Sequence, residues 1–423
     1  MLFGALFTFI SFSWLYSVYP LQWLAKGSLQ IVGILIVHLL LTLIGAVCFS
    51  VVAIHTHVKN KYLPSPLIFA STLVLAEVIK SLLITTLFSG VGTKLGFHFT
   101  ASTLGNTLST TPLIEFAYFG GTFTLTLVLG YIIYCTQSKK HFLFYKKHLL
   151  VILAILAWTH LVLPVATPRE GTKVGIVTTN FKTPEKESEY ATFFRNQAKE
   201  VHKLTLSFAS TSPNFIVYPE DTRYLSSLND QKDVNILTEL FPKTIFIDST
   251  TRPSFLGLST VSFFYYPKGD KKIARGKEFL LPFNEYVPTI FQPIITFFVG
   301  KENFNEYERL HTFAPTYSKK SILVDQTRVG TLICSEMFSY SVINGLKNEN
   351  PTIVFYQAHL PVFHNNPLAI MHLRSISKVA AAQLRTPVIS SISGAPSYII
   401  SPYGSILRTI PMGTGTSTYT FSH

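Results

Sequence analysis

The chain has 423 residues, of which 48% are hydrophobic and only 13% are charged, about half the charged share of an average soluble domain. Its net charge of +13 is basic enough for a protein that binds nucleic acid. However, most of the lysines in the first 166 residues lie between apolar runs rather than along one face. We therefore exclude a nucleic-acid partner, and expect these lysines to set membrane topology and to attract anionic lipid.

Charged residues divide the chain into two parts. Before residue 167 there are only two acidic residues, Glu77 and Glu115, against nine lysines and no arginine. We interpret residues 1–166 as a membrane domain and residues 167–423 as a globular domain. Glu77 and Lys80 are three residues apart, so in a helix they would lie on one face and could pair. An internal ion pair and a functional charge inside the membrane both remain open.

Five apolar segments in the first part are long enough to cross about 30 Å of hydrocarbon. Their approximate bounds are 2–18, 29–54, 66–89, 113–135 and 148–166. The first segment lacks the basic start and the small-residue cleavage site of a signal peptide, so we interpret it as a retained helix.

The lysines between these segments predict the orientation of the chain. Residues 55–62 contain two lysines and residues 136–148 contain four, whereas the alternate connections contain only Lys26 and Lys94. The positive-inside rule places the richer connections in the cytoplasm. With five spans, the N-terminus is then cytoplasmic and all residues after 167 are extracytoplasmic.

From Lys173 onward the pattern changes to short runs rich in Val, Ile, Phe and Tyr, which are typical of strands. Helical patterns at 187–209 and 366–384 alternate with these runs. Strands that are apolar on both faces and alternate with helices predict a layered α/β domain.

Three residues of this domain are candidates for catalysis. Glu220 ends the apolar run FIVYPE, at the rim of the sheet where ligands tend to bind. Lys277 precedes EFLLPFNEYVP and could pair with Glu220 or Glu285. Cys334 ends VGTLIC before a predicted turn and helix start, which would expose its thiol and lower the thiol pKa. Taken singly, each has a structural alternative: a strand terminus, a loop lysine and a buried core cysteine.

Metal and cofactor motifs are absent from the sequence. It contains no HExxH, CxxC or GxxxxGK[ST] motif. The loose group of His359, His364 and His372 has a spacing that suits no metal site. We therefore expect neither a metal nor an organic cofactor.

The order Glu220, Lys277, Cys334 resembles the Glu-Lys-Cys triad of the nitrilase superfamily. Within it, KEFLLPFNEYVP is similar to the Lys-x-x-Leu-Val-Pro-Phe-Gly-Glu-Tyr-Val-Pro segment of apolipoprotein N-acyltransferases, and LICSE resembles their Leu-Ile-Cys-Tyr-Glu. Residues 372–407 resemble the family's post-catalytic helix, strand and closing hairpin. PLIEFAYFGG resembles a membrane segment of the same family.

The resemblance implies a polytopic α-helical membrane domain followed by a nitrilase-type α-β-β-α sandwich. It implies that a phospholipid acyl chain passes through a Cys334 thioester to the N-terminal amine of a diacylglyceryl-cysteine lipoprotein. Glu220 would be the general base and Lys277 the oxyanion donor. The resemblance also implies a monomer in the bacterial cytoplasmic (inner) membrane. Supporting or substrate-binding roles would fall to Glu285, Glu336, Ser335 and His359.

Several positions depart from the family pattern. Ser335 replaces a tyrosine, Asn284 replaces a glycine, and Asn180 ends TTN in place of Gln-Gly-Asn. AHLPVFHNNP, around His359, replaces a Trp-Phe loop. These changes put the substrate in doubt more than the type of reaction.

Two alternatives therefore stay open: a membrane-tethered amidase or hydrolase that uses water, and a non-catalytic lipoprotein-binding homologue. A lipid enzyme needs an apolar groove that opens at the bilayer. Residues 291–300, FQPIITFFVG, would be either a lid that dips into lipid or a buried strand or helix.

Overall fold

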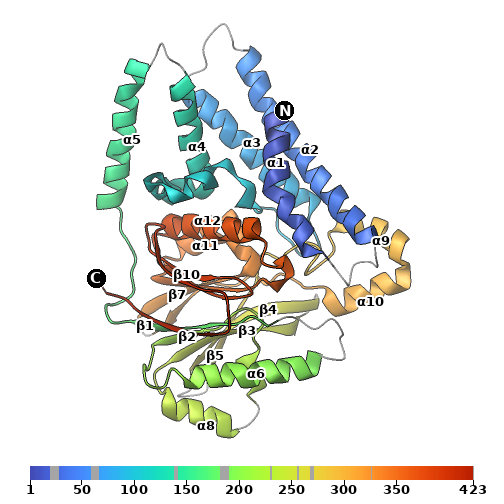
Figure 1. Ribbon diagram of the computed structural model, residues 1–423, viewed down its shortest axis with the longest axis vertical. Coiled ribbons are helices and arrows are strands. Elements are labelled where there is room, and N and C mark those ends of the chain that lie inside the picture. Colours follow the sequence, from blue (N-terminus) through green and yellow to red (C-terminus); the bar gives the residue numbers. More distant parts are fainter. Residues whose placement is uncertain are drawn as a thin grey trace.

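The computed structural model describes residues 1–19, 28–58, 66–137, 142–181, 190–228, 231–254, 257–266, 271–324 and 326–422. The first part is helical, and a two-sheet α/β domain follows it (Figure 1). The long helices of the first part are α1 (Leu2–Phe12), α2 (Ser28–Val58), α3 (Pro66–Leu87), α4 (Ala117–Gln137) and α5 (Phe142–Val162).

Three of the described helices are long and apolar enough to cross a membrane: Gln30–Val52, Pro66–Leu87 and Pro112–Thr136. They correspond to the second, third and fourth predicted spans. The apolar stretches at Leu2–Val18 and Leu150–Val162 are shorter. In addition, residues 2–18 are not one continuous α-helix, because a 3₁₀ helix, η1 (Ser13–Val18), follows α1. Membrane crossing by these two stretches stays a prediction.

The helices of the first part share one side of the molecule. All five lie on one side of the α/β domain, and the ends of α2 and α4 lie far from it (Figure 1). The starts of α3 and α5 lie at the same far end. Lys59, Lys61, Lys139 and Lys140, which set the predicted orientation, fall outside the described residues. The orientation relative to a membrane therefore stays a prediction.

Glu77 and Lys80 form the expected pair on α3. The Glu77 Oε2 and Lys80 Nζ atoms are 2.5 Å apart, and both side chains are buried. Lys80 also donates to the Ser102 carbonyl at 2.7 Å, and Glu77 accepts from the Leu104 N–H at 2.9 Å. The pair thus fixes the connection between α3 and α4, which favours the internal ion pair over a functional charge.

The α/β domain contains two six-stranded sheets. The first has the order β12-β1-β2-β3-β4-β5 and the second has the order β11-β10-β9-β8-β7-β6. Within them, β1, β2 and β3 run parallel to one another, as do β7, β8 and β9. The strands are β1 (Lys173–Thr178), β2 (Phe215–Val217), β3 (Ile245–Ser254), β4 (Gly257–Tyr266), β5 (Lys271–Gly276), β6 (Ser321–Val324), β7 (Thr327–Ile333), β8 (Ile353–His359), β9 (Val388–Ser393), β10 (Ser397–Ile400), β11 (Ile406–Ile410) and β12 (Gly415–Thr420).

The sheets and their helices form four layers. Side chains such as Ile176, Val217 and Phe355 pack between the two sheets. Helices α6 (Tyr190–Leu206) and α8 (Gln231–Leu240) lie against the outer face of the first sheet (Figure 1). Helices α11 (Tyr340–Asn348) and α12 (Pro367–Leu384) cover the second sheet. This confirms the predicted layered α/β domain.

Helix α12 also joins the two parts of the chain. On one side, Leu373 and Ala380 belong to the core beneath the second sheet. On the other side, Val379 and Ala382 pack with Leu125 and other residues of the helical part. Small residues along α12 allow this close approach on both sides, so the α/β domain sits directly against the helices of the first part (Figure 1).

Candidate active site

The three candidate catalytic residues follow three strand ends. Glu220 lies just after β2, Lys277 immediately after β5 and Cys334 immediately after β7. The first two strands belong to one sheet and the third to the other. The structure brings the three residues together at the edge where these strand ends meet, although 114 positions separate the first from the last.

Lys277 is the centre of the cluster. Its side chain is 1% exposed, and Nζ donates to Glu220 Oε1 at 3.0 Å and to Glu285 Oε1 at 2.8 Å. The sequence left its partner open between these two carboxylates, and the structure shows that it binds both. Glu285 in turn accepts from the Leu281 N–H at 2.6 Å. The loop after Lys277 therefore brings a second carboxylate, that of Glu285, into contact with the Lys277 ammonium.

Cys334 lies at a strained position of the backbone. Its φ is +44°, a conformation that residues other than glycine rarely adopt. It is also the first residue of a short 3₁₀ helix, η8 (Cys334–Phe338), as the predicted strand-to-helix junction requires. Positive φ at such a junction is typical of functional sites that the surrounding structure holds in place.

Glu336 holds this junction. Its buried carboxylate accepts from the Ile333 N–H at 2.8 Å and from the Glu278 N–H at 2.7 Å. Arg275 Nη1 and Nη2 donate to the same carboxylate at 2.5 and 2.9 Å. Glu336 thus ties the residue before Cys334 to the residue after Lys277. Arg275 was not a candidate in the sequence, because it belongs to none of the motifs that resemble the family.

The remaining candidates make backbone contacts. The Ser335 hydroxyl donates to the Phe279 carbonyl at 2.5 Å. The His359 N–H donates to Glu220 Oε2 at 3.3 Å, so the strand end of β8 also orients the carboxylate. The Tyr356 hydroxyl, which the sequence did not single out, donates to the Cys334 carbonyl at 3.1 Å.

The electrostatics favour a protonated thiol at rest. Burial raises the pKa of Cys334 well above its usual value, and Glu220, which also accepts a hydrogen bond from the thiol, raises it further. Lys277 opposes this shift without overcoming it. This is the reverse of the lowered pKa that we expected from a helix start, because burial outweighs the short 3₁₀ helix.

Lys277 stays charged in this setting. Burial alone would lower its pKa, but Glu220 and Glu285, with Cys334, raise the pKa well above its usual value. A neutral thiol beside a carboxylate and a fixed ammonium can react only after the carboxylate has removed the thiol proton. The site therefore has the composition of a general base, a nucleophile and an oxyanion donor.

Two hollows flank the loop that joins Lys277 to Tyr286. An apolar groove of about 270 Å³ lies between 281–284, the start of α2, η1 and the helix α9 (Gln292–Val299). Its lining also includes Val362 and Phe363, which follow His359. Of the described residues that line it, only Gln30 and Asn284 are polar.

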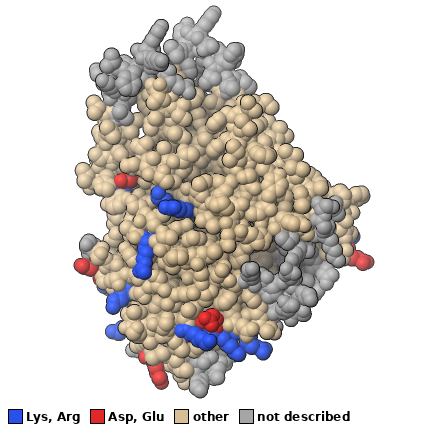
Figure 2. All heavy atoms as spheres, in the orientation of Figure 1, with Lys and Arg blue, Asp and Glu red and all other residues tan. Residues whose placement is uncertain are grey.

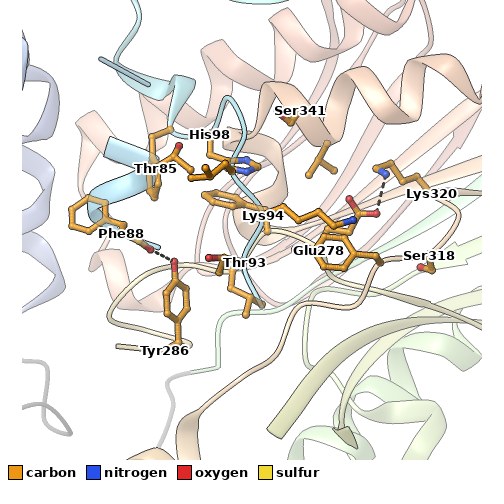
Figure 3. Close-up of a pocket in the computed structure, with 16 residues that line it drawn as sticks. Thr85, Phe88, Thr93, Lys94, His98, Glu278, Tyr286, Ser318, Lys320 and Ser341 are labelled. Atoms are coloured by element: carbon orange, nitrogen blue, oxygen red, sulfur yellow. Dashed lines mark hydrogen bonds and ion pairs between the residues drawn. The ribbon is translucent and has the colours of Figure 1, made fainter. Parts of the chain in front are cut away.

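The second hollow is a more polar pocket of about 410 Å³ (Figure 3). Glu278 and Tyr286 line it from the loop, and Lys94 and His98 line it from the connection between α3 and α4. Lys320 points toward Glu278 and pairs with it at 2.8 Å (Figure 3). The loop between Lys277 and Tyr286 therefore contributes residues to both hollows, the apolar groove and the polar pocket.

His98 links the helical part to the nucleophile. Its ring stacks on Phe279 with a 4.4 Å centroid distance, and Nδ1 lies 2.6 Å from the Ser339 hydroxyl. Phe279 accepts the Ser335 hydrogen bond, and Ser339 caps α11, the helix after η8. Burial lowers the pKa of His98 to about 4, so the ring is neutral. No local pattern predicts the contact between His98 and Ser339, since 241 positions separate these two residues.

Among the described residues, no group of three or more His, Cys, Asp or Glu side chains could hold a metal ion. His364 Nδ1 lies 2.6 Å from the Ser17 carbonyl. Burial lowers the pKa values of His359 and His372. The histidines near the site thus contact backbone or are buried, and the described chemistry depends on Cys, Lys and Glu.

No family model and no curated protein matches the sequence. Among solved structures, the chain is similar to an amidase of the nitrilase superfamily from Nesterenkonia AN1, with 10% identity, a TM-score of 0.41, and 60% of this chain and 92% of the amidase covered. A member of branch 10 of the nitrilase superfamily from Saccharomyces cerevisiae has 13% identity and a TM-score of 0.41, with coverage of 60% and 92%.

Glutamine-dependent NAD+ synthetase from Acinetobacter baumannii has 12% identity and a TM-score of 0.42, with 60% of this chain and 46% of the synthetase covered. All three TM-scores are below 0.5, so these likenesses define neither the substrate nor the reaction of this chain. Its function has to be inferred from its own residues.

Proposed function

We propose that this protein is a membrane acyltransferase of nitrilase type. It takes an acyl chain from a phospholipid onto Cys334 and transfers it to the N-terminal amine of a diacylglyceryl-cysteine lipoprotein. The observation that carries the proposal is the Glu220–Lys277–Cys334 cluster, together with the loop after Lys277, which lines an apolar groove shared with the helical part. Apolipoprotein N-acyltransferase, which the motifs resemble, is an enzyme of this class.

In the first half-reaction, Glu220 removes the proton of the Cys334 thiol. The sulfur attacks the ester carbonyl carbon, and Lys277 stabilises the oxyanion that forms. One such donor lowers the barrier by about 3–4 kcal/mol. The C–O bond to the glycerol then breaks, Glu220 returns the proton to the leaving alkoxide, and a lysophospholipid departs. The acyl chain stays on Cys334 as a thioester.

In the second half-reaction, an α-amine attacks the thioester carbonyl. Glu220 again accepts a proton, this time from the amine, and Lys277 again stabilises the oxyanion. The C–S bond breaks, the thiolate regains the proton from Glu220, and an amide is released. The two halves form a ping-pong cycle in which one carboxylate moves every proton.

The groove supports a lipid as the acyl donor. Its wall α9 is an apolar helix with none of its residues buried, and Phe297 on it is 83% exposed. Of the two interpretations of residues 291–300, this excludes the buried strand or helix. An exposed apolar helix beside the membrane helices fits contact with the bilayer (Figure 1). A hydrolase of small soluble amides needs no apolar groove for its substrate.

The polar pocket next to the same loop suits the polar part of a substrate. Lys94 lies over the Tyr317 ring at 3.7 Å, while Lys320 pairs with Glu278. A phospholipid head group or the polar part of an acceptor fits this chemistry better than an acyl chain does. The two hollows thus match a substrate with one apolar and one polar end.

The test is to incubate the protein in nanodiscs with alkyne-tagged phosphatidylethanolamine and to measure an acyl adduct that hydroxylamine removes. Cys334→Ala and Cys135→Ala are run in parallel, the second as a matched thiol control. We expect an adduct on the wild type and on Cys135→Ala, and none on Cys334→Ala. A folded wild type without any adduct would contradict a phospholipid donor. Labelling with small amides would then favour the hydrolase, and no labelling at all would favour the binding homologue.

A further inference from the structure

A basic groove lies on the side of the α/β domain that faces away from the helical part. It has a volume of about 760 Å³ and runs between α6 and residues 223–228, which include the short helix α7 (Tyr224–Ser227). Among the residues that the structure describes, none that lines it is acidic, and four are Lys or Arg: Arg195, Lys199, Lys203 and Arg223. Lys and Arg side chains gather over α6 at the lower edge of the molecule (Figure 2).

Three of these cations form a ladder along α6. Arg195, Lys199 and Lys203 are spaced by four residues, so they share one helix face at steps of about 6 Å. All three are exposed. Among the described carboxylates, only Glu200 pairs with the ladder, at 3.7 Å from Lys203. Most of the positive charge of the ladder is therefore not neutralised by the described residues.

On the opposite wall of the groove, the side chains of Arg223 and Tyr224 already have interaction partners. Arg223 donates to both oxygens of Asp221, at 2.6 and 2.9 Å, and its guanidinium lies 4.1 Å from the Phe194 ring centroid. His202 Nδ1 lies 2.9 Å from the Tyr224 hydroxyl. These contacts make a fixed wall, and they leave the α6 ladder as the charged surface for a ligand.

We propose that this groove binds an extended acidic polypeptide segment of a protein partner. In an extended chain, alternate residues point to the same side and are about 6.6–6.8 Å apart. Carboxylates at alternate positions therefore match the steps of about 6 Å along α6. The proposal does not rest on the acyl transfer proposed above, since no residue of the groove belongs to the catalytic cluster.

Two other polyanions fit the groove less well. Single-stranded nucleic acid needs free aromatic faces for base stacking, but Phe194 is covered by Arg223 and Tyr224 is buried. An anionic lipid surface would lie with the apolar helices, which are on the other side of the domain (Figure 1). The chemistry of the groove thus favours a peptide.

The test uses the full chain in nanodiscs of phosphatidylcholine, which carries no net charge. Fluorescence anisotropy follows the binding of a labelled peptide of alternating Glu and Ser. A peptide of alternating Gln and Ser is the matched ligand control. The variant Arg195→Gln/Lys199→Gln/Lys203→Gln removes the ladder. The variant Lys301→Gln/Lys319→Gln/Arg328→Gln removes three exposed charges elsewhere on the domain.

We expect the ladder variant to bind the acidic peptide at least about 10-fold more weakly, the sum of three exposed ion pairs. The control variant should bind within about 2-fold of the wild type, and higher salt should weaken binding. Equal binding by the wild type and the ladder variant would overturn the proposal. So would an equal loss in the control variant, or tighter binding of an oligothymidylate of equal charge. Acyl-adduct formation by the ladder variant should match the wild type, which separates this proposal from the catalytic one.

Discussion

Replacing Glu336 by leucine should destabilise the α/β domain more than any surface change. Glu336 is fully buried and accepts four hydrogen bonds, two from Arg275 and two from backbone N–H groups. Glu336→Leu leaves the Arg275 guanidinium buried without its counter-ion. Breaking a buried pair in this way costs about 3–5 kcal/mol. For a domain of this size that corresponds to a fall in Tm on the order of 10 °C.

Thermal unfolding followed by circular dichroism is the suitable assay. All three tryptophans precede residue 167, at positions 14, 23 and 158, so none belongs to the sequence of the α/β domain, and circular dichroism follows that domain more directly than tryptophan fluorescence does. Glu302→Leu, at an exposed helical position, is the control and should change Tm by no more than about 2 °C, because surface changes cost at most ~0.5 kcal/mol.

The double variant Arg275→Met/Glu336→Leu separates pairing from packing. It should regain most of the lost stability, because it replaces a buried ion pair by apolar side chains of similar volume. An unchanged Tm in Glu336→Leu would contradict the pairing account. So would a loss of stability in the double variant that exceeds the sum of the losses in Glu336→Leu and Arg275→Met.

Alkylation of Cys334 by iodoacetamide should be slow at neutral pH and should rise with pH to a midpoint above that of the denatured chain, because the folded thiol pKa is raised. Lys277→Met should slow it further, since it removes the charge that favours the thiolate; faster alkylation would refute this. His98→Ala should slow adduct formation about 10-fold (~1.4 kcal/mol), and His98→Asn should restore the rate. The pH profile of His98→Ala between pH 5 and 8 should match that of the wild type, because the His98 pKa is about 4. Loss of folding in circular dichroism would instead show a structural role. Phe297→Asp should lower adduct formation from vesicles but not from a soluble short-chain ester; equal losses would contradict bilayer contact by α9.

Several strands of the α/β domain were predictable because they form short runs rich in β-branched and aromatic residues. KVGIVT, TIVFYQAH and VISSIS are each buried along almost their whole length between the other sheet and the helices. In contrast, β12, GTSTYT, has few apolar residues and lies at the edge beside β1. Its place in the sheet depends on pairing with a distant strand, which a local pattern does not contain.

The candidate site was only partly predictable. The order of Glu220, Lys277 and Cys334 carries a family resemblance, and the structure brings these residues and Glu285 together. Arg275 and His98 gave no signal, because their roles depend on contacts with residues far along the chain. Burial also reversed the expected direction of the Cys334 pKa shift, and burial cannot be read from a strand end.

The most direct test of the acyltransferase is the fate of the Cys334 thioester. The adduct would be formed from tagged phosphatidylethanolamine, freed of donor, and chased with a diacylglyceryl-cysteine peptide that has a free α-amine. The account predicts that the peptide speeds the loss of the thioester and that the tag appears in an amide on the peptide. An N-acetylated peptide should have no effect. Loss at the same rate with or without the peptide, with release of the free fatty acid, would contradict acyl transfer and identify water as the acceptor.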